Sequence, residues 1–311
     1  KEVDLDTHKM ESPTSPESQY KKPLPILTVG TYNIHSCVGS DGIYSVSRVA
    51  DMINHLNVDV VALQEVEVNS SWQKTRLWSS SHGDDQVSLL SELTGMKYTA
   101  FGKAVTSVSI GGIKEEHDTE KSKDGNFGIA ILSKVPLEDV EVKMYKRYKN
   151  KTPRNALSAK ITLNGRAVRL ICTHLGCHTG AEQHQQSVEL SGWMSSFDGS
   201  SAVVVCGDTN SPPWFRSMRR LLGGSEGFEG CGNRDRTFPA LGWPGCFWMT
   251  CCRPVLLLDY VFYKDGNGWI TCAGTEVVKD KGMLVASDHR PVRVAFVEKS
   301  GTVEVNPNNI V

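Results

Sequence analysis

The sequence predicts an α/β (α+β) domain in which helices flank two packed β-sheets. Apolar runs of strand length outnumber the segments with helical periodicity, and the helical segments fall between some of the strands. The 311 residues allow one large domain or two ordinary ones, at about 150 residues each. Because no repeat of fixed period and no linker interrupts the middle of the chain, we expect one domain.

The first half of this pattern begins with a strand and a helix. The β-branched apolar run 26–29 predicts the first strand. Apolar residues then recur at helical spacing from 46 to 56, with Ser45 as the N-cap and Asn57 as the stop. The continuous apolar run 58–63 is typical of a strand that is buried on both faces.

The remaining elements continue the alternation of strands and helices. The charged, glycine-bearing segment 111–124 predicts a loop. Helices are expected at 85–93, 181–197 and 214–222, and strands at 98–105, 127–132, 157–163, 168–173, 202–206, 256–263, 269–277 and 292–297.

The charge balance excludes a strong global attraction to polyanions. Lys and Arg total 34 and Asp and Glu total 35, which gives a net charge of −1. Nucleic-acid binding would therefore need a local basic patch. A basic cluster between 143 and 154 could serve, and its alternative interpretation is the solvated face of a hairpin: Lys143, Lys146, Arg147, Lys149, Lys151 and Arg154.

The ends of the chain and its cysteines bear on location. Residues 1–24 and 300–311 are expected to be flexible polar tails, and no apolar run reaches the ~18 residues of a spanning helix. The chain has nine cysteines, several of them within apolar runs, and no C-x-x-C pair. This pattern indicates free buried thiols in a reducing compartment, so we expect an intracellular protein, cytoplasmic or nuclear, without structural zinc.

Acidic, amide and imidazole side chains recur where the predicted strands end. Each one alone also fits a turn former or an ordinary surface or core residue. Taken together they indicate a site, because strand ends of a rigid sheet combine precise placement with access to solvent. The residues are Asn33, His35, Glu65, His174, Asp208, Asn210, Asp259, Asp288 and His289.

The motifs around these residues resemble those of the endonuclease/exonuclease/phosphatase superfamily, the DNase I-like and abasic-site endonuclease-like metal-dependent phosphoesterases. The similarity extends from about Leu27 to Val297, so it covers nearly the whole chain. It implies a four-layer α/β sandwich of two facing, mainly antiparallel sheets flanked by helices, in a domain at 25–299. The motifs are, in order, Thr31–His35, Leu63–Val66, Thr173–Leu175, Gly207–Asn210, Leu258–Tyr260 and Ser287–His289.

The resemblance also implies a hard divalent cation. Glu65 is the expected carboxylate ligand, Asn33 assists it directly or through water, and Asp288 is the third expected metal residue. Oxygen ligands favour Mg²⁺, or Mn²⁺, over zinc. His35 stands where abasic-site endonucleases carry Asp, so one acidic metal contact of that branch is missing.

For the reaction, the resemblance implies that Asp208 activates or orients the attacking water. His289 is expected to contact the scissile phosphate, with Asp288 fixing its tautomer. Either Asp208 or the Asp288–His289 pair is the general base, and the sequence leaves that choice open.

The other site residues have expected supporting roles. Asn210 holds the same water or a phosphate oxygen, and His174 donates to a non-bridging oxygen. Asp259 orients His174 or lies near the metal. Arg154 is a candidate phosphate contact, with an ordinary surface arginine as the alternative. Trp214 is a candidate platform for a base or sugar, with core packing as the alternative.

These expectations favour an Mg²⁺-dependent hydrolase of phosphodiester bonds, with nucleic acid as the leading substrate and a monomeric chain. The alternative is a phosphatase or phosphodiesterase for a small or lipid headgroup, such as a phosphoinositide or sphingomyelin. An inactive binding module is disfavoured because every expected site residue is present.

Overall fold

The computed structural model describes residues 23–69, 83–106, 126–149, 151–197, 199, 201–223, 228–232, 235–240, 255–280 and 282–299. The expected loop at 111–124, the expected tail at 300–311 and residues 1–22 of the expected N-terminal tail lie outside these ranges. Within them, no helix is long and apolar enough to cross a membrane.

Two sheets of six strands each form the centre of the molecule. The first sheet has the order β11 (Ile270–Val277), β12 (Val292–Glu298), β1 (Leu27–Asn33), β2 (Val60–Val68), β4 (Asn126–Ser133) and β3 (Tyr98–Thr106). The second sheet has the order β5 (Glu138–Met144), β6 (Asn155–Leu163), β7 (Arg166–His174), β8 (Ala202–Asp208), β10 (Asp259–Asp265) and β9 (Glu229–Gly230).

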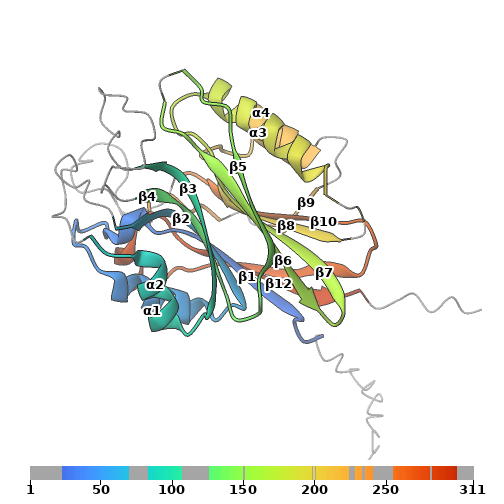
Figure 1. The fold of residues 1–311 in the computed structure, drawn as a ribbon, viewed down its shortest axis with the longest axis horizontal. Helices are drawn as coiled ribbons and strands as arrows, with labels where there is room; N and C mark the ends of the chain where they lie inside the picture. The colour runs from blue at the N-terminus through green and yellow to red at the C-terminus, as the bar shows by residue number, and fades with distance from the viewer. Residues whose placement is uncertain are drawn as a thin grey trace, which may run out of the picture.

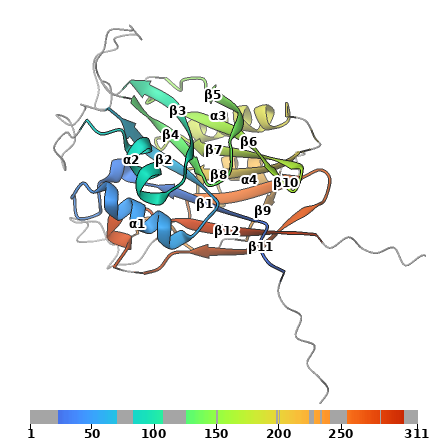
Figure 2. The same ribbon diagram turned by 60° about the horizontal axis from the view of Figure 1, so that its bottom comes forward.

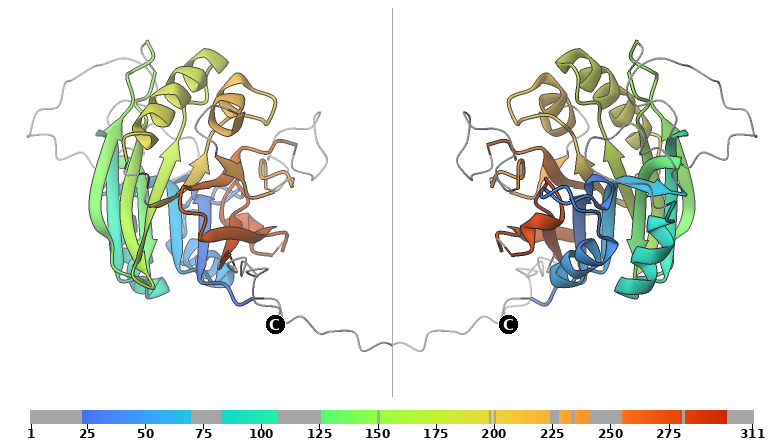
Figure 3. Two further views of the ribbon diagram at one scale, coloured as in Figure 1. Left: turned by 90° about the vertical axis from the view of Figure 1, so that its right-hand side faces the viewer. Right: turned by 90° about the vertical axis from the view of Figure 1, so that its left-hand side faces the viewer.

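Helices cover the outer faces of both sheets. Helices α1 (Val46–Leu56) and α2 (Gln86–Thr94) lie over the first sheet, and α3 (Gly180–Met194) and α4 (Arg216–Gly223) lie over the second, on the opposite side of the molecule (Figure 1; Figure 3). Short 3₁₀ helices occur at His35–Cys37 and Leu284–Ala286. This confirms the predicted four-layer α/β sandwich.

Each sheet contains one parallel pair among antiparallel neighbours. Strands β1 and β2 run parallel, as do β7 and β8. In both cases a helix, α1 or α3, lies in the crossover connection. Because parallel strands end at the same edge of a sheet, each pair delivers two sets of polar residues to one place.

The core explains why the continuous apolar runs became central strands. Side chains from both sheets pack between them, including Val29, Ile129, Leu170, Val204 and Phe296. The opposite faces of the same strands pack under the helices, so β1, β2, β4 and β8 are buried on both faces. Figure 2 shows β12 beside β1, with β11 at the outer edge of the first sheet.

Local capping fixes the ends of α1 as predicted, and α2 is capped in a similar way. The Ser45 side chain accepts a hydrogen bond from the backbone N–H of Arg48, and Asn57 ends α1 in the left-handed conformation with φ of 46°. Asp85 caps α2 through the backbone N–H of Ser88, and Gly95 ends that helix. These caps position α1 and α2 over the first sheet.

Candidate active site

The ends of the two parallel pairs meet where the sheets face each other. Asn33, the last residue of β1, donates from Nδ2 to Asp208 Oδ2 of β8 over 3.0 Å and to Glu65 Oε1 of β2 over 3.3 Å. The amide oxygen of Asn33 accepts from the backbone N–H of His35. One buried amide therefore joins the two sheets and holds both carboxylates.

Glu65 lies on a β-bulge. The pairing of β2 with β4 shifts between Gln64 and Val66, and Glu65 has a φ of 58°. That conformation costs a non-glycine residue about 1–3 kcal/mol and persists only where the surroundings impose it. The predicted strand was expected to stop at this motif, but β2 continues to Val68 beyond the bulge.

Neighbouring core contacts impose the bulge geometry. The Gln64 side chain is fully buried, and its Nε2 donates to Thr31 Oγ1 over 3.2 Å and to Cys172 Sγ over 3.4 Å. Gln64 points into the core between the two sheets, where it contacts β1 and β7. Glu65, the extra residue of the bulge, points instead to Asn33 at the end of β1.

Asp208 is the most central carboxylate of the site and is 1% exposed. Its Oδ1 accepts from the backbone N–H of Asn210 over 2.8 Å. Burial raises the pKa of Asp208 to about 7, with the charge of His289 opposing and that of Asp259 adding to the rise. Gly207 precedes it because a Cβ there would collide with the carbonyl of Thr173 on β7.

His289 is paired with Asp259, and the expected pairing with Asp288 is wrong. Asp259 Oδ2 lies 2.8 Å from His289 Nδ1, and His289 Nε2 lies 3.7 Å from Asp208 Oδ2. Burial acts to lower the pKa of His289, but the negative charges of Asp259 and Asp208 outweigh it and raise that pKa well above its usual range.

Asp288 lies on the other side of this turn. Its Oδ1 is 3.9 Å from His35 Nδ1, and the preceding Ser287 donates from Oγ to the backbone oxygen of Asn33 over 2.7 Å. The chain bends at 288 and 289, so these adjacent side chains point to different partners. Asp288 therefore lies beside His35 and the end of β1, and its charge also helps to raise the pKa of His289.

His174 is oriented by Arg154, so the expectation that Asp259 orients it is wrong. His174 Nδ1 lies 3.3 Å from Arg154 Nη1, and its Nε2 lies 3.2 Å from Asn210 Nδ2 and 3.5 Å from Asp208 Oδ2. Burial, and then the charge of Arg154, lower the pKa of His174 well below its usual range. A guanidinium only donates, so Nδ1 of the neutral ring accepts from Arg154.

Arg154 itself is not an ordinary surface arginine. It is 9% exposed, and its Nε has no hydrogen-bond partner among the described residues. A buried guanidinium with an unused donor is suited to an anion. Trp214, in contrast, is 64% exposed, so core packing is excluded for it.

Three positioning contacts were not predicted. Thr237 Oγ1 accepts from the backbone N–H groups of Leu258 and Asp259, over 3.1 and 3.3 Å. The Phe238 ring lies 4.9 Å from the His289 ring. On α3, Gln183 Nε2 donates to the backbone oxygen of Asn210 over 2.6 Å. Gln183 is a polar residue on the inward face of α3. The helical periodicity of apolar residues could not reveal it, because a polar residue does not contribute to that pattern.

The donor set suits a hard divalent cation. Asn33 contacts Glu65 through its side chain, and its backbone oxygen holds Ser287 next to Asp288. The Glu65 and Asp288 carboxylates and the Asn33 amide offer oxygen atoms, the ligand atoms that Mg²⁺ and Mn²⁺ prefer. Within the described ranges, the group of three possible metal-ligating side chains whose ligand atoms lie within 4.8 Å of one another consists of Asp208, Asp259 and His289.

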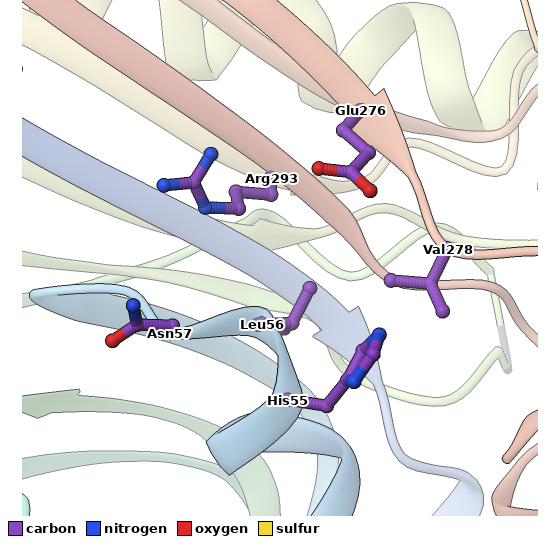
Figure 4. A pocket seen from close by; sticks show the side chains of 6 residues that line it. All are labelled: His55, Leu56, Asn57, Glu276, Val278 and Arg293. Atoms are coloured by element: carbon purple, nitrogen blue, oxygen red, sulfur yellow. The ribbon is translucent and has the colours of Figure 1, made fainter. Parts of the chain in front are cut away.

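A separate pocket lies away from these strand ends. Arg293 pairs with Gly30 on β1, and a Cβ on Gly30 would contact Leu56 of α1, so the pocket is on the outer face of the first sheet. None of the predicted site residues lines it. Its lining residues are His55, Leu56, Asn57, Glu276, Val278 and Arg293 (Figure 4).

The fold and site together define an α/β sandwich with an acid–imidazole site at the strand ends. The family model described as the endonuclease/exonuclease/phosphatase family matches residues 30–289. The chain belongs to that family, whose members hydrolyse phosphoester bonds. The resemblance expected from the motifs is thereby confirmed. A search of curated proteins found no match to the chain.

Solved structures with the same fold carry different activities. An endonuclease/exonuclease/phosphatase from Beutenbergia cavernae is 21% identical with a TM-score of 0.66, over 88% of this chain and 72% of that one. A mannosyl-6-phosphatase from Bacteroides thetaiotaomicron is 15% identical with a TM-score of 0.61, over 87% and 99%. TDP2 from D. rerio with a single-strand DNA product is 18% identical with a TM-score of 0.60, over 87% and 98%.

Proposed function

We propose that this protein is an Mg²⁺-dependent phosphodiesterase that hydrolyses nucleic acid. The observation that carries the proposal is that Asp208, His289 and His174 gather around a single point between the two sheets, beside the buried Arg154. An acid, two imidazoles and a guanidinium provide a proton acceptor and several donors to an anionic phosphate.

The cation would be held by Glu65 and Asp288, with Asn33 assisting. When bound, it neutralises the negative charge that develops on phosphate oxygens during displacement. Asn33 donates hydrogen bonds to both Glu65 and Asp208. It therefore fixes the distance between Glu65, the metal ligand, and Asp208, the residue that activates water. Mn²⁺ has the same preference for oxygen donors and is the expected substitute.

We assign the role of general base to Asp208. Both nitrogens of His289 face carboxylates, Asp259 on one side and Asp208 on the other, so both nitrogens carry protons. An imidazole protonated on both nitrogens cannot accept a further proton from water. Asp208 can accept one at Oδ2, the oxygen that faces both histidines.

The remaining residues bind the phosphate. His289 donates from Nε2, and Asp259 stabilises the positive charge on its ring. His174 is neutral and donates from Nε2, while Arg154 accounts for its tautomer and offers the unused Nε donor to a non-bridging oxygen. Asn210 lies against His174 and holds the water or a phosphate oxygen.

Exposed residues beside the site support a polymeric substrate. The basic hairpin begins at the site, since the backbone N–H of Tyr145 bonds the Arg154 oxygen over 3.0 Å. Its Lys146 and Lys149 are exposed and form no salt bridge within the described part of the chain. Trp214 follows the Asp208 motif and is exposed. Cations along a backbone track and an aromatic platform suit single-stranded nucleic acid.

A panel of substrates tests the proposal. Plasmid DNA, single-stranded oligonucleotides, a sugar phosphate, an inositol phosphate and sphingomyelin vesicles would each be incubated with Mg²⁺ or with chelator. We expect cleavage of nucleic acid that chelator abolishes. Turnover of only the sugar phosphate, inositol phosphate or lipid would support the alternative of a small-headgroup enzyme; the Bacteroides thetaiotaomicron neighbour is a mannosyl-6-phosphatase. No turnover of any of them would favour a binding module.

Replacing Glu65 with Gln is expected to raise the Mg²⁺ concentration for half-maximal activity by at least ~10-fold, because a carboxylate ligand becomes a neutral amide. The measurement is a titration of activity with Mg²⁺. Asp51→Asn on the exposed face of α1 is the matched control and should leave the titration unchanged. An unaltered Mg²⁺ requirement in Glu65→Gln would remove Glu65 from the metal site.

Replacing Trp214 with Ala is expected to weaken single-stranded oligonucleotide binding by ~1–3 kcal/mol, about 5- to 150-fold, because one stacked base loses its platform. Turnover of a small aryl phosphodiester should not change, since it does not reach the platform. Trp193→Phe, on the α3 side of the aromatic pair with Phe197, is the control. An equal loss on both substrates would mean that Trp214 shapes the catalytic loop instead.

A further inference from the structure

Two cysteines from opposite sheets meet at one edge of the sandwich. Cys272 lies on β11, the edge strand of the first sheet, and Cys231 directly follows β9, the edge strand of the second. Cys272 Sγ is 3.8 Å from the backbone oxygen of Cys231, and the Cys272 side chain packs against the core cluster that contains Cys231. Thr275 Oγ1 donates to the same backbone oxygen.

The local backbone explains this approach. The pairing of β11 with β12 shifts between Cys272 and Gly274, so a bulge alters the direction of the strand at Cys272. Cys231 is anchored from the other side, where its backbone N–H donates to the oxygen of Val261 on β10 over 3.2 Å. Both segments are therefore held in place beside each other at this edge of the sandwich.

The two thiols differ in access to solvent. Cys231 is 6% exposed and belongs to the core between the sheets. Cys272 is half-buried and packs against the edge of that core. A reagent from solvent therefore reaches Cys272 first. Any oxidised form of Cys272 is then next to Cys231.

We propose that Cys231 and Cys272 are an oxidation site that hydrogen peroxide converts into a disulfide joining the edges of the two sheets. The Cys272 thiolate attacks one peroxide oxygen, an S–O bond forms, the O–O bond breaks, and the leaving hydroxide takes a proton as water. Cys231 sulfur then attacks the sulfenic sulfur, the S–S bond forms, the S–O bond breaks, and the second water leaves with the Cys231 proton. Both sulfurs are oxidised by one electron each, and one peroxide is reduced to two waters.

The electrostatics of the pair agree with this division of roles. The hydrogen bond from Cys231 is the largest cause that lowers the pKa of Cys272 to about 6, against the opposing effect of burial. The same hydrogen bond, and then burial, raise the pKa of Cys231. Glu229 and Cys206 are the other ionisable groups that act on Cys231. Cys272 is thus the thiolate and Cys231 keeps its proton until the second step.

The other described cysteines lack this combination. Burial raises the pKa of each of Cys37, Cys172 and Cys206. Cys177 is exposed, but burial of its thiol also raises its pKa. Cys177 is therefore the matched control, an exposed thiol whose pKa is raised and whose neighbour is Arg154 and not a second cysteine.

The disulfide would close the chain between 231 and 272. That loop contains Thr237 and Phe238, which hold Asp259 and His289 in place. Restricting the unfolded chain stabilises the folded state, so oxidation should raise Tm by several degrees and dithiothreitol should reverse the rise.

The experiment uses the full reduced chain and a stoichiometric amount of hydrogen peroxide, followed by alkylation, digestion and mass spectrometry. We expect a cross-linked peptide pair carrying Cys231 and Cys272, lighter by two hydrogens than the sum of its parts, that dithiothreitol removes. Cys177→Ser should form the same cross-link, and Cys272→Ser should leave Cys231 as an alkylated thiol. Before oxidation, Cys272 should react with iodoacetamide at pH 7 faster than Cys177.

Two results would overturn the proposal. One is conversion of Cys272 to sulfinic acid with Cys231 still a free thiol, and the other is a cross-link of Cys272 to a different cysteine. Should Cys272→Ser not fold, the peptide map and the Tm shift of the unaltered chain still decide between these outcomes.

Discussion

Replacing His289 with Ala is expected to lower turnover of nucleic acid by more than ~100-fold. The imidazole is the phosphate donor that Asp259 holds in its charged form, and alanine leaves no donor at that position. Alanine also leaves the buried Asp259 carboxylate without its cation, which lowers stability. His289→Gln keeps a donor toward Asp259 and serves as the second variant. Both should lose turnover, and circular dichroism should show that the glutamine variant keeps the native fold.

A double-mutant cycle then tests whether Asp259 or Asp288 is energetically coupled to His289. Because Asp259 bonds His289 Nδ1 over 2.8 Å, Asp259→Asn should lower turnover in the native chain but add little loss to His289→Gln. Asp288 belongs to the metal side, so Asp288→Asn should cause a similar loss in both backgrounds. The reverse pattern, with Asp288 coupled to His289 and Asp259 additive, would refute the assignment.

The strands and helices could be predicted from the sequence where burial requires a regular pattern of apolar residues. Strands β2 and β8 contain continuous apolar runs because helices cover one face of each strand and the opposite sheet covers the other. Strand β5 was not predicted. It is an edge strand that is exposed along nearly its whole length, so charged residues dominate its composition.

A period-two signal was nevertheless present in β5. Val140, Val142 and Met144 alternate with charged residues, and they are 48%, 46% and 44% exposed. An alternating pattern whose apolar face is not buried is weak evidence for a strand, because burial is what usually maintains it. Strand β9 is shorter still, at two residues, and no periodicity can be read from that length.

The positions of the site residues could be predicted, but their pairings could not. Adjacency in the sequence suggested that Asp288 orients His289, yet Asp259, 30 residues earlier, is the partner at 2.8 Å. Side-chain direction at a bend depends on backbone geometry and not on sequence separation. The same limit applies to Asn33, whose amide bonds Asp208 across 175 positions of chain.

Replacing Asp208 with Asn is expected to lower turnover by more than ~100-fold, because the amide cannot accept a proton from the attacking water. The amide has the size of the carboxylate, so the packing around it is kept. Its oxygen can still accept a hydrogen bond from Asn33 or from the backbone of Asn210. Single-turnover kinetics with an oligonucleotide measure the loss in the chemical step apart from binding.

The stability of this variant separates catalysis from folding. Burial and the charge of Asp259 raise the pKa of Asp208, so the ionised carboxylate disfavours the folded state above the carboxyl's ordinary pKa. Removing that charge should therefore leave Tm unchanged or raised while turnover falls. Asp259→Asn, which removes the counter-charge of His289 instead, should lower Tm. A large drop in Tm for Asp208→Asn would mean that the carboxylate is a structural link between the two sheets and that its effect on turnover follows from unfolding.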